Sequence, residues 1–192
     1  MEIIFATKNK GKLKEIKEIL KDFTVLGMEE IGIDLDVIED GDTFEANALK
    51  KAVEIMEATG KIVLSDDSGL EIDYLNKEPG VDSANYLGRE TPYAERNAFI
   101  LNKLKNAKEE ERSARYVAVI GAAFPGGKTL SAKGVMEGYI GYEQRGGNGF
   151  GYDPIFCPEG FGQSVAELTP EIKNSISHRG KALRKMKEML SL

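Results

Sequence analysis

The sequence predicts an α/β protein in which helices flank a mixed β-sheet. A short apolar segment typical of a strand opens the chain, and a helical pattern follows at once, as in a parallel α/β unit. Later, two long strand-like segments flank Pro125-Gly126-Gly127, which predicts an antiparallel hairpin. With 192 residues, of which 41% are hydrophobic, the chain can bury a substantial core, and we expect a single domain over residues 1–192.

The first third of the chain predicts two strands and two helices. Residues 2–6 form the first strand, and apolar side chains recur at helical spacing over residues 13–20. A second strand is expected at residues 23–27, followed by an acidic loop at residues 29–42. The next helix is expected over residues 43–60, because this segment begins at a threonine that can cap a helix and ends at a glycine.

The middle of the chain predicts four strands and one helix. Residues 62–66 predict a buried strand that ends at the first of two adjacent aspartates, and residues 70–74 alternate as the next strand. A helix is expected near residues 91–106, after a loop that contains glycine and proline. Residues 116–124 and 129–140 are the two strands of the predicted hairpin.

The last part of the chain predicts a glycine-rich loop, a short strand and a helix. The loop is expected at residues 146–151 and the strand at residues 154–156. Apolar side chains within residues 183–190 recur at helical spacing, so the final helix is expected to turn them towards the core. No internal repeat or linker interrupts this pattern, which supports a single domain.

Charge and composition narrow the classes of protein. A net charge of −6 argues against a general nucleic-acid binder, because binding to the phosphate backbone needs a broad basic surface. Cys157 is the only cysteine, so no intrachain disulfide can form, and we expect it to be a buried small hydrophobic residue. No basic leader and no apolar run of membrane-spanning length is present, so we expect a cytoplasmic protein without a membrane partner.

Three lysines crowd the predicted junction between the first strand and the first helix. The segment reads Thr7-Lys8-Asn9-Lys10-Gly11-Lys12. A helix N-terminus already carries partial positive charge, so added lysines are unfavourable there unless an anion such as a polyphosphate binds. The alternative is a solvated lysine face on which Asn9 caps the helix. The segment alone does not separate these interpretations.

Two acidic segments offer ligands for a divalent cation. Glu39 lies in the acidic loop, and Asp66 and Asp67 follow a buried strand. Mg²⁺ prefers carboxylate and water oxygens and commonly binds one or two carboxylates together with substrate phosphates. In an extended chain the two adjacent aspartates point to opposite faces, so we expect only one of them to meet a given ligand. The alternative for this segment is an ordinary turn.

Two further segments combine residues that suit ligand binding. Residues 146–153 place glycines beside aromatic and acidic side chains that could stack on a base and form hydrogen bonds with it, although a plain connection between strands is the alternative. Ser177-His178-Arg179-Gly180 opens the final helix, with Lys173 upstream. His178 is the only histidine, and a lone histidine at a helix start is usually structural.

Taken together and in this order, these segments resemble the inosine/xanthosine triphosphate pyrophosphatase family. The resemblance rests on Thr7, Asn9 and Lys12, on Glu39 to Phe44 with Asn47, on Ser65 to Leu70, on Phe150 to Phe156, and on Ser177 to Gly180. It implies an elongated mixed α/β fold with two lobes around a substrate cleft, and a homodimer. It also implies Mg²⁺-dependent hydrolysis of ITP, dITP or XTP to the nucleoside monophosphate and pyrophosphate, which removes deaminated purines from the nucleotide pool.

The resemblance also implies a role for each segment. Glu39 and Asp67 are expected to bind Mg²⁺, and Asp67 is expected to be the catalytic base that activates water. The triphosphate is expected at Thr7, Lys8, Asn9, Lys10, Gly11 and Lys12, with Ser68 as a further substrate contact. The residues expected to recognise the base are Phe150, Gly151, Tyr152, Asp153, Lys173, His178 and Arg179.

Three alternatives to this function differ in substrate or class. One is a nucleotide pyrophosphatase of the related Maf type, which would differ in its preference for the base. Another is a non-catalytic module that binds nucleotides or RNA through the lysine-rich helix start, against which the acidic net charge and the carboxylates count. A serine hydrolase centred on His178 is disfavoured, because the sequence has no Gly-x-Ser-x-Gly motif.

Overall fold

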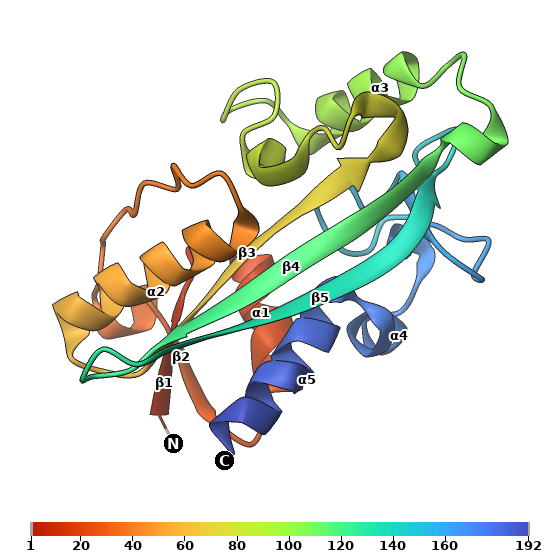
Figure 1. The fold of residues 1–192 in the computed structure, drawn as a ribbon. Helices are drawn as coiled ribbons and strands as arrows, with labels where there is room; N and C mark the ends of the chain where they lie inside the picture. The colour runs from red at the N-terminus through yellow and green to blue at the C-terminus, as the bar shows by residue number, and fades with distance from the viewer. Residues whose placement is uncertain (1, 192) are drawn as a thin grey trace. The chain divides into compact units, whose positions relative to one another are not determined.

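The computed structural model describes residues 2–191 and contains a six-stranded mixed β-sheet with helices packed on it (Figure 1). Its strands are β1 (Glu2–Ala6), β2 (Thr24–Gly27), β3 (Val63–Ile72), β4 (Ser113–Ala123), β5 (Thr129–Ile140) and β6 (Phe156–Pro158). They are arranged in the order β2-β1-β3-β4-β5-β6. Strand β1 pairs in parallel with β2 and β3, whereas β5 and β6 are antiparallel, so the predicted mixed sheet is confirmed.

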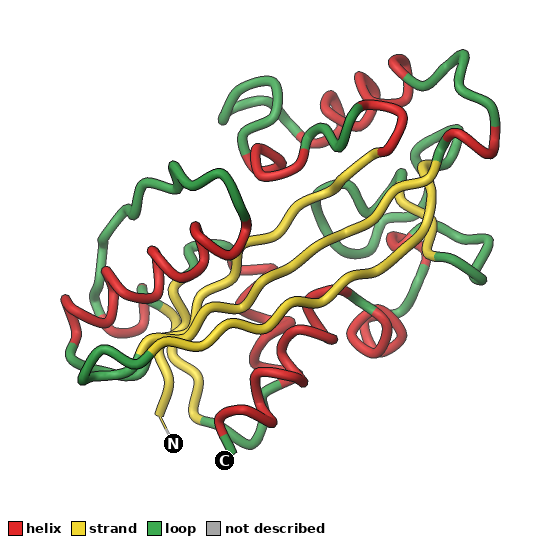
Figure 2. Tube along the Cα trace, viewed as in Figure 1, coloured by secondary structure: helices red, strands yellow, loops and turns green. Residues whose placement is uncertain are grey.

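Five α-helices connect or follow these strands in the described residues (Figure 2). They are α1 (Lys10–Ile19), α2 (Phe44–Thr59), α3 (Tyr93–Lys103), α4 (Pro170–Ile176) and α5 (His178–Leu190). Short 3₁₀ turns lie at Glu29–Ile31, Asp73–Leu75, Gly80–Ala84, Glu109–Glu111 and Val165–Glu167. The helices predicted from spacing and capping are confirmed, and α4 was not predicted.

The described residues form two compact units. Unit 1 contains the described residues up to Ser68, the segment Ala118–Gly134, and the described residues from His178 onward. Unit 2 contains Gly69–Val117 and Val135–Ser177. Strands β3, β4 and β5 each contribute residues to both units.

Unit 1 has helices on both faces of its part of the sheet (Figure 1). Along β1, Ile3 and Phe5 are buried against a cluster that includes residues of α1 and α5. Their neighbours Ile4 and Ala6 are buried against a second cluster that includes residues of α2. This alternation is the period of two that a strand imposes on its side chains.

Helix α2 begins and ends where its sequence predicts. Thr43 is extended and its Oγ1 accepts a hydrogen bond from the N–H of Ala46 at 3.1 Å, which caps the helix start. Gly60 ends the helix with a φ of 63°, a left-handed conformation that glycine adopts without strain. Helix α2 carries Asn47 and Lys51 one turn apart. Because the caps fix the ends of the helix, they also fix the positions of these two polar side chains of the candidate site.

Helix α5 packs very closely on strand β5 at Gly134. A Cβ added to Gly134 would lie 2.1 Å from the carbonyl oxygen of His178 and 2.6 Å from the amide nitrogen of Ala182. Both are backbone atoms, so the helix as a whole would have to move. We expect Gly134→Ala to lower the free energy of unfolding by about 2 kcal/mol or more. Urea denaturation tests this, with Gly147→Ala as the control, because nothing lies within 4 Å of a Cβ at Gly147.

Strand β3 differs from the prediction. The sequence predicted one strand that ends at Asp66 and a second over residues 70–74, but residues Val63–Ile72 form one continuous strand. Residues along the whole strand have favourable contacts, so the chain continues without a turn. Asp66 and Ser68 form hydrogen bonds in unit 1, and Leu70 and Ile72 are buried in unit 2. Beyond the strand, residue 74 lies in a 3₁₀ turn.

The remaining predictions from the sequence differ from the structure only in detail. The last strand begins at Phe156 rather than at residue 154, and a 3₁₀ turn opens the expected acidic loop. In α5, Leu183 and Met186 are fully buried, as predicted, and Cys157 is buried. Among residues 2–191, no helix is long and apolar enough to cross a lipid bilayer.

Candidate functional site

The segment after β1 is a capped helix start held by its own side chains. Thr7 Oγ1 accepts a hydrogen bond from the N–H of Asn9 at 3.1 Å, and Asn9 Oδ1 accepts one from the N–H of Lys12 at 3.0 Å. Asn9 is therefore the N-cap of α1. These contacts fix the backbone of the segment at the carboxyl end of β1, beside the parallel strand β3. Ligands of α/β proteins bind at such strand ends.

The lysines of this segment do not share one partner. Lys8 Nζ lies 2.9 Å from Asp34 and 3.9 Å from Asp36, both in the acidic loop. Lys12 Nζ instead lies 2.5 Å from a carboxylate oxygen of Asp66 in β3. Ion pairs of exposed side chains contribute little stability, so a polyphosphate could displace Lys8 from its partners at small cost.

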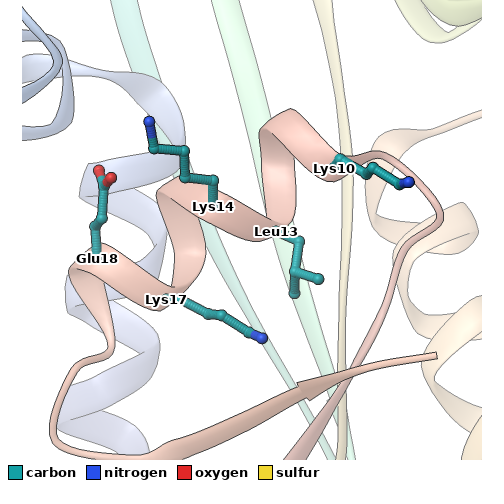
Figure 3. A pocket seen from close by; sticks show the side chains of 5 residues that line it. All are labelled: Lys10, Leu13, Lys14, Lys17 and Glu18. Atoms are coloured by element: carbon teal, nitrogen blue, oxygen red, sulfur yellow. The ribbon is translucent and has the colours of Figure 1, made fainter. Parts of the chain in front are cut away.

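A pocket beside α1 does not gather positive charge. It is lined by Lys10, Leu13, Lys14, Lys17 and Glu18 (Figure 3). Lys10 points away from Lys14, and Lys17 lies on another side of the helix. Lys17 Nζ also pairs with Glu30 at 2.7 Å. Because the ammonium groups do not converge, we assign no ligand to this pocket.

Asp66 is a buried carboxylate, and each of its two oxygens is bonded to a cationic side chain of the protein. Its Oδ1 accepts hydrogen bonds from Lys12 Nζ at 2.5 Å and from Ser68 Oγ at 3.0 Å. Its Oδ2 accepts one from Arg179 Nε at 3.0 Å. Burial opposes ionisation of Asp66, but the charges of Arg179 and Lys12 outweigh it and hold its pKa well below the usual range. Asp66 is therefore ionised and has little capacity left for a metal ion.

Arg179 bonds to several side chains on the Asp66 side of β3. Besides its bond to Asp66, Arg179 donates from Nη1 to Glu15 Oε2 at 2.6 Å and from Nη2 to Ser68 Oγ at 3.1 Å. It is the second residue of α5, where a cation meets the positive end of the helix dipole. The two carboxylates offset that repulsion. The guanidinium thus links α1, β3 and α5 within unit 1.

Asp67 lies on the opposite face of β3, towards α2. Strand alternation separates it from Asp66, as the sequence predicts. The residue is buried, and its Oδ1 accepts a hydrogen bond from the N–H of Ser68 at 3.0 Å. Its Oδ2 is buried and has no hydrogen-bond partner among residues 2–191. A buried carboxylate oxygen without a partner is unfavourable for folding alone, which points to a ligand or a catalytic role.

The surroundings of Asp67 raise its pKa to about 6. Burial is the largest cause, and the negative charge of Glu39 is the second. Lys12, Lys51 and the side chain of Asn47 act in the opposite direction. A carboxylate with this pKa is mostly ionised at neutral pH and is still a stronger base than an exposed aspartate.

The donor set at Asp67 fits a magnesium ion that also binds phosphate. Among residues 2–191, no three histidine, cysteine, aspartate or glutamate side chains converge as they would in a site built from protein ligands alone. Glu39 and Asp67 interact as two like charges, and one carboxylate oxygen of Asp67 has no protein partner. Mg²⁺ commonly binds one or two carboxylates and completes its shell with water and phosphate oxygens. Two carboxylates therefore suffice.

Two polar side chains of α2 belong to the same site but were not among the predicted site residues. Lys51 Nζ forms an ion pair with Glu39. Asn47 Oδ1 accepts a hydrogen bond from the N–H of Gly41 at 2.7 Å, which ties the acidic loop to α2. Residues 47 and 51 are four apart and share one face of the helix, a spacing that the sequence already displays.

In unit 2, a buried ion pair supports the glycine-rich loop of residues 146–153. Lys173 Nζ lies 2.8 Å from Asp153 Oδ2, and both side chains are buried. Asp153 also accepts hydrogen bonds from Tyr116 Oη at 3.2 Å and from the N–H of Phe150 at 2.9 Å. The ammonium of Lys173 lies 4.5 Å from the centroid of the Phe150 ring. Only glycine fits at Gly149, because a Cβ there would lie 2.1 Å from Asp153 Oδ2.

The other half of this loop is anchored by its tyrosine. Tyr152 is buried, and its hydroxyl donates to the carbonyl of Ser83 at 2.7 Å. Its ring meets the ring of Tyr93 edge to face, with centroids 5.2 Å apart. Gly151 has a φ of 69°, which favours glycine. The loop is therefore built into unit 2, whereas a plain connection between strands needs no such contacts.

The structure brings some predicted site residues together. Unit 1 contains the segment after β1, Ser68 and the two carboxylates Glu39 and Asp67. Unit 2 contains Lys173 and four of the other residues expected to recognise the base, 150–153. His178 and Arg179 belong to unit 1, where Arg179 forms hydrogen bonds with Asp66 and Glu15. Their predicted contact with the base stays a prediction.

Comparisons with known proteins identify the family of the chain. The model of the Ham1 family matches residues 3–189. A dITP/XTP pyrophosphatase of Clostridium perfringens is 47% identical over 98% of this chain and 97% of its own length, and one of Bacillus subtilis is 44% identical over 98% and 96%. The structure of the Staphylococcus aureus Ham1 protein superposes with a TM-score of 0.89 at 40% identity and covers 100% of this chain and 98% of its own. Because the match extends over nearly the whole chain, this protein belongs to the Ham1 family.

Proposed function

We propose that this protein hydrolyses noncanonical purine nucleoside triphosphates, such as dITP, ITP and XTP, to the nucleoside monophosphate and pyrophosphate. The observation that carries the proposal is Asp67, a buried carboxylate with a raised pKa and a free oxygen, beside a second carboxylate and a lysine. The relatives from Clostridium perfringens and Bacillus subtilis are dITP/XTP pyrophosphatases, which supports this choice of substrate.

In the proposed reaction, a water molecule attacks the α-phosphorus of the triphosphate. A bond forms between the water oxygen and this phosphorus, and the bond from the phosphorus to the oxygen that bridges the α and β phosphates breaks. Asp67 accepts the proton of the water, and pyrophosphate leaves with the bonding electron pair. A base with a pKa of about 6 is suited to this step near neutral pH.

Unit 1 carries the charges that a triphosphate requires. The segment Thr7 to Lys12 offers a helix N-terminus, and Lys8 and Lys10 offer ammonium groups. We propose that Glu39 and Asp67 hold Mg²⁺. When bound there, this ion supplies positive charge that neutralises the phosphate oxygens and stabilises the departing pyrophosphate.

We propose that unit 2 recognises the base through the glycine-rich loop. Phe150 is half-buried and is held in place by Lys173 and Asp153, so its ring is a fixed apolar surface beside polar groups. A pocket whose donors point at the 6-oxo group of inosine or xanthine leaves those donors unpaired against adenine, at a cost of about 1 to 3 kcal/mol per group. Ser68, His178 and Arg179 complete the proposed substrate contacts.

The proposal also includes the cellular setting. On the family resemblance, we propose that both units act as one pyrophosphatase domain and that the protein is a cytoplasmic homodimer. A single cysteine is in keeping with a reducing compartment. Size-exclusion chromatography with light scattering tests the dimer, because a mass near the 21.1 kDa of one chain would contradict it.

We predict that the purified protein releases pyrophosphate from ITP, dITP and XTP with Mg²⁺ and loses this activity in EDTA. Hydrolysis of GTP and ATP should be weaker by a factor of about 10 or more, because each mispaired polar group changes binding by about one order of magnitude. Pyrophosphate and orthophosphate are assayed separately, so that the cleaved bond is identified.

Other outcomes of this assay favour the other functions. Release of orthophosphate, or a preference for ATP or GTP, would contradict the proposed substrate and favour another nucleotidase, such as a Maf-type enzyme. No turnover of any nucleotide, together with binding of ITP, would indicate a non-catalytic nucleotide-binding module. Activity that persists in EDTA would contradict the metal site at Glu39 and Asp67 but not the substrate.

A further inference from the structure

We propose that Asn97 of α3 is a positioning residue that fixes the glycine-rich loop and so determines selectivity for the base. This inference rests on the proposed function for the role of the loop in recognising a base. Its structural part, that Asn97 holds the loop at Gly151, is independent of any substrate.

The contact is direct and lies within unit 2. Asn97 is 1% exposed, and its Nδ2 donates a hydrogen bond to the carbonyl oxygen of Gly151 at 3.2 Å. The same amide lies 3.4 Å from Gln144 Oε1, and Gln144 in turn donates to the carbonyl of Ala94 at 3.1 Å. Both neighbours of Nδ2 are oxygen acceptors, so the orientation of the amide is determined. Asn97 thus uses its donor to hold the backbone of the loop.

The oxygen of the same amide lowers the stability of the fold, so stability does not explain the presence of Asn97. Asn97 Oδ1 is buried and has no hydrogen-bond partner among residues 2–191. Burial of an acceptor without a partner destabilises a fold, and an apolar side chain of similar size would avoid this penalty. The amide at this position is therefore explained by its Nδ2, which holds the carbonyl of Gly151.

Gly151 is the point at which the loop most needs such a hold. It lies between Phe150 and Tyr152, and a glycine by itself restricts the backbone less than any other residue. Phe150 is held through its N–H by Asp153, and Tyr152 is held through its hydroxyl by Ser83. Among the described residues, Asn97 is the side chain that donates to the carbonyl of Gly151. Without this bond, the Gly151–Tyr152 peptide loses the side-chain contact that fixes the direction of its carbonyl.

A shifted Phe150 ring should affect recognition of the base more than cleavage of the phosphate. The groups proposed for phosphate and metal binding all belong to unit 1, whereas Asn97 forms its hydrogen bonds within unit 2. The loss of this one hydrogen bond should therefore raise KM for the preferred nucleotide and leave kcat nearly unchanged. It should also reduce the preference for ITP over GTP.

Asn97→Leu tests this positioning role, because it removes the donor and also the unpaired oxygen. We expect KM for ITP to rise by about fivefold or more, the ITP:GTP selectivity to fall by a similar factor, and kcat to change by less than about twofold. The thermal midpoint should change little, because removal of the unpaired Asn97 oxygen offsets the loss of the bond to the Gly151 carbonyl. Asn102→Leu is the matched control, because Asn102 is exposed on the same helix, and it should leave both kinetic constants unchanged.

Hydrogen exchange gives a readout that needs no activity. In Asn97→Leu, the amides of residues 149–153 should exchange faster than in the wild type, whereas the segments of unit 1 should not change. If Asn97→Leu does not fold, Asn97→Ser serves instead, since it is too short to reach Gly151. Unchanged exchange in this loop, or unchanged KM and selectivity in an active enzyme, would overturn the proposal. If the wild type hydrolyses none of the nucleotides, the proposed function fails, and the exchange experiment still decides whether Asn97 holds the loop.

Discussion

Replacement of Asp67 by asparagine should abolish most of the hydrolysis and at the same time stabilise the fold. The substitution keeps the shape of the side chain and the acceptor for the N–H of Ser68. It removes the negative charge with which, in the proposed mechanism, this group accepts a proton from water and helps to hold Mg²⁺. General-base catalysis commonly contributes a factor of about 10² to 10⁴, and we expect kcat to fall by that order.

The gain in stability follows from the pKa of Asp67. Its folded value of about 6 lies above the value of about 4 for an unfolded aspartate, so the folded state binds the proton more tightly. The wild type therefore loses stability as the pH rises from about 4 to about 6, and asparagine, which does not ionise, avoids this loss. Above pH 6 we expect Asp67→Asn to be more stable by about 1 to 3 kcal/mol, and below pH 4 we expect no difference.

Two measurements check this expectation. The kcat/KM of the wild type should rise with pH and level off above about pH 6, because this ratio reports the ionisation of the free enzyme and the base must be deprotonated. Urea denaturation of both proteins at several pH values should show the stability difference appear over the same interval. Near-normal turnover of Asp67→Asn would contradict its role as the base, and a variant less stable than the wild type at pH 8 would contradict the raised pKa.

Local sequence patterns were sufficient to predict the framework of the fold. The caps at Thr43 and Gly60, the strand at residues 2–6 and the hairpin at Pro125-Gly126-Gly127 depend on neighbouring residues, and all three are confirmed. The opposite orientation of Asp66 and Asp67 was also predictable, because it follows from the period of a strand. The continuity of β3 was not, since two acids before a glycine are locally typical of a turn.

The partners of the site residues depend on tertiary structure and could not be predicted. Arg179 is 113 positions from Asp66, and no local pattern links the two. The unpaired oxygen of Asp67 is likewise a property of packing, although the residue itself was identified by resemblance. Lys51 is a different case, because its spacing from Asn47 could have indicated that it belongs to the site.

Asp66→Asn should have the opposite effect on stability to the same substitution one residue further along. Asp66 is the counterion of Lys12 and Arg179, and both of its carboxylate oxygens accept hydrogen bonds. Removal of this charge leaves the Arg179 guanidinium buried beside the carboxylate of Glu15, without the carboxylate of Asp66. The loss of one member of a buried ion cluster costs about 3 to 5 kcal/mol, so we expect a loss of this size at pH 7.

The pH dependence distinguishes this loss from a general packing defect. The folded pKa of Asp66 is lowered, so its contribution to stability is fully present above the unfolded pKa of about 4 and disappears as the pH falls towards the folded value. The difference between Asp66→Asn and the wild type should therefore be largest at neutral pH and shrink below about pH 4. A difference that is the same at pH 7 and pH 3 would show that packing, rather than the charge of Asp66, determines the loss. With Asp67→Asn as the matched control, the two substitutions should have opposite effects. The carboxylate on one face of β3 should stabilise the fold, and the carboxylate on the other face, which is the proposed catalytic base, should destabilise it.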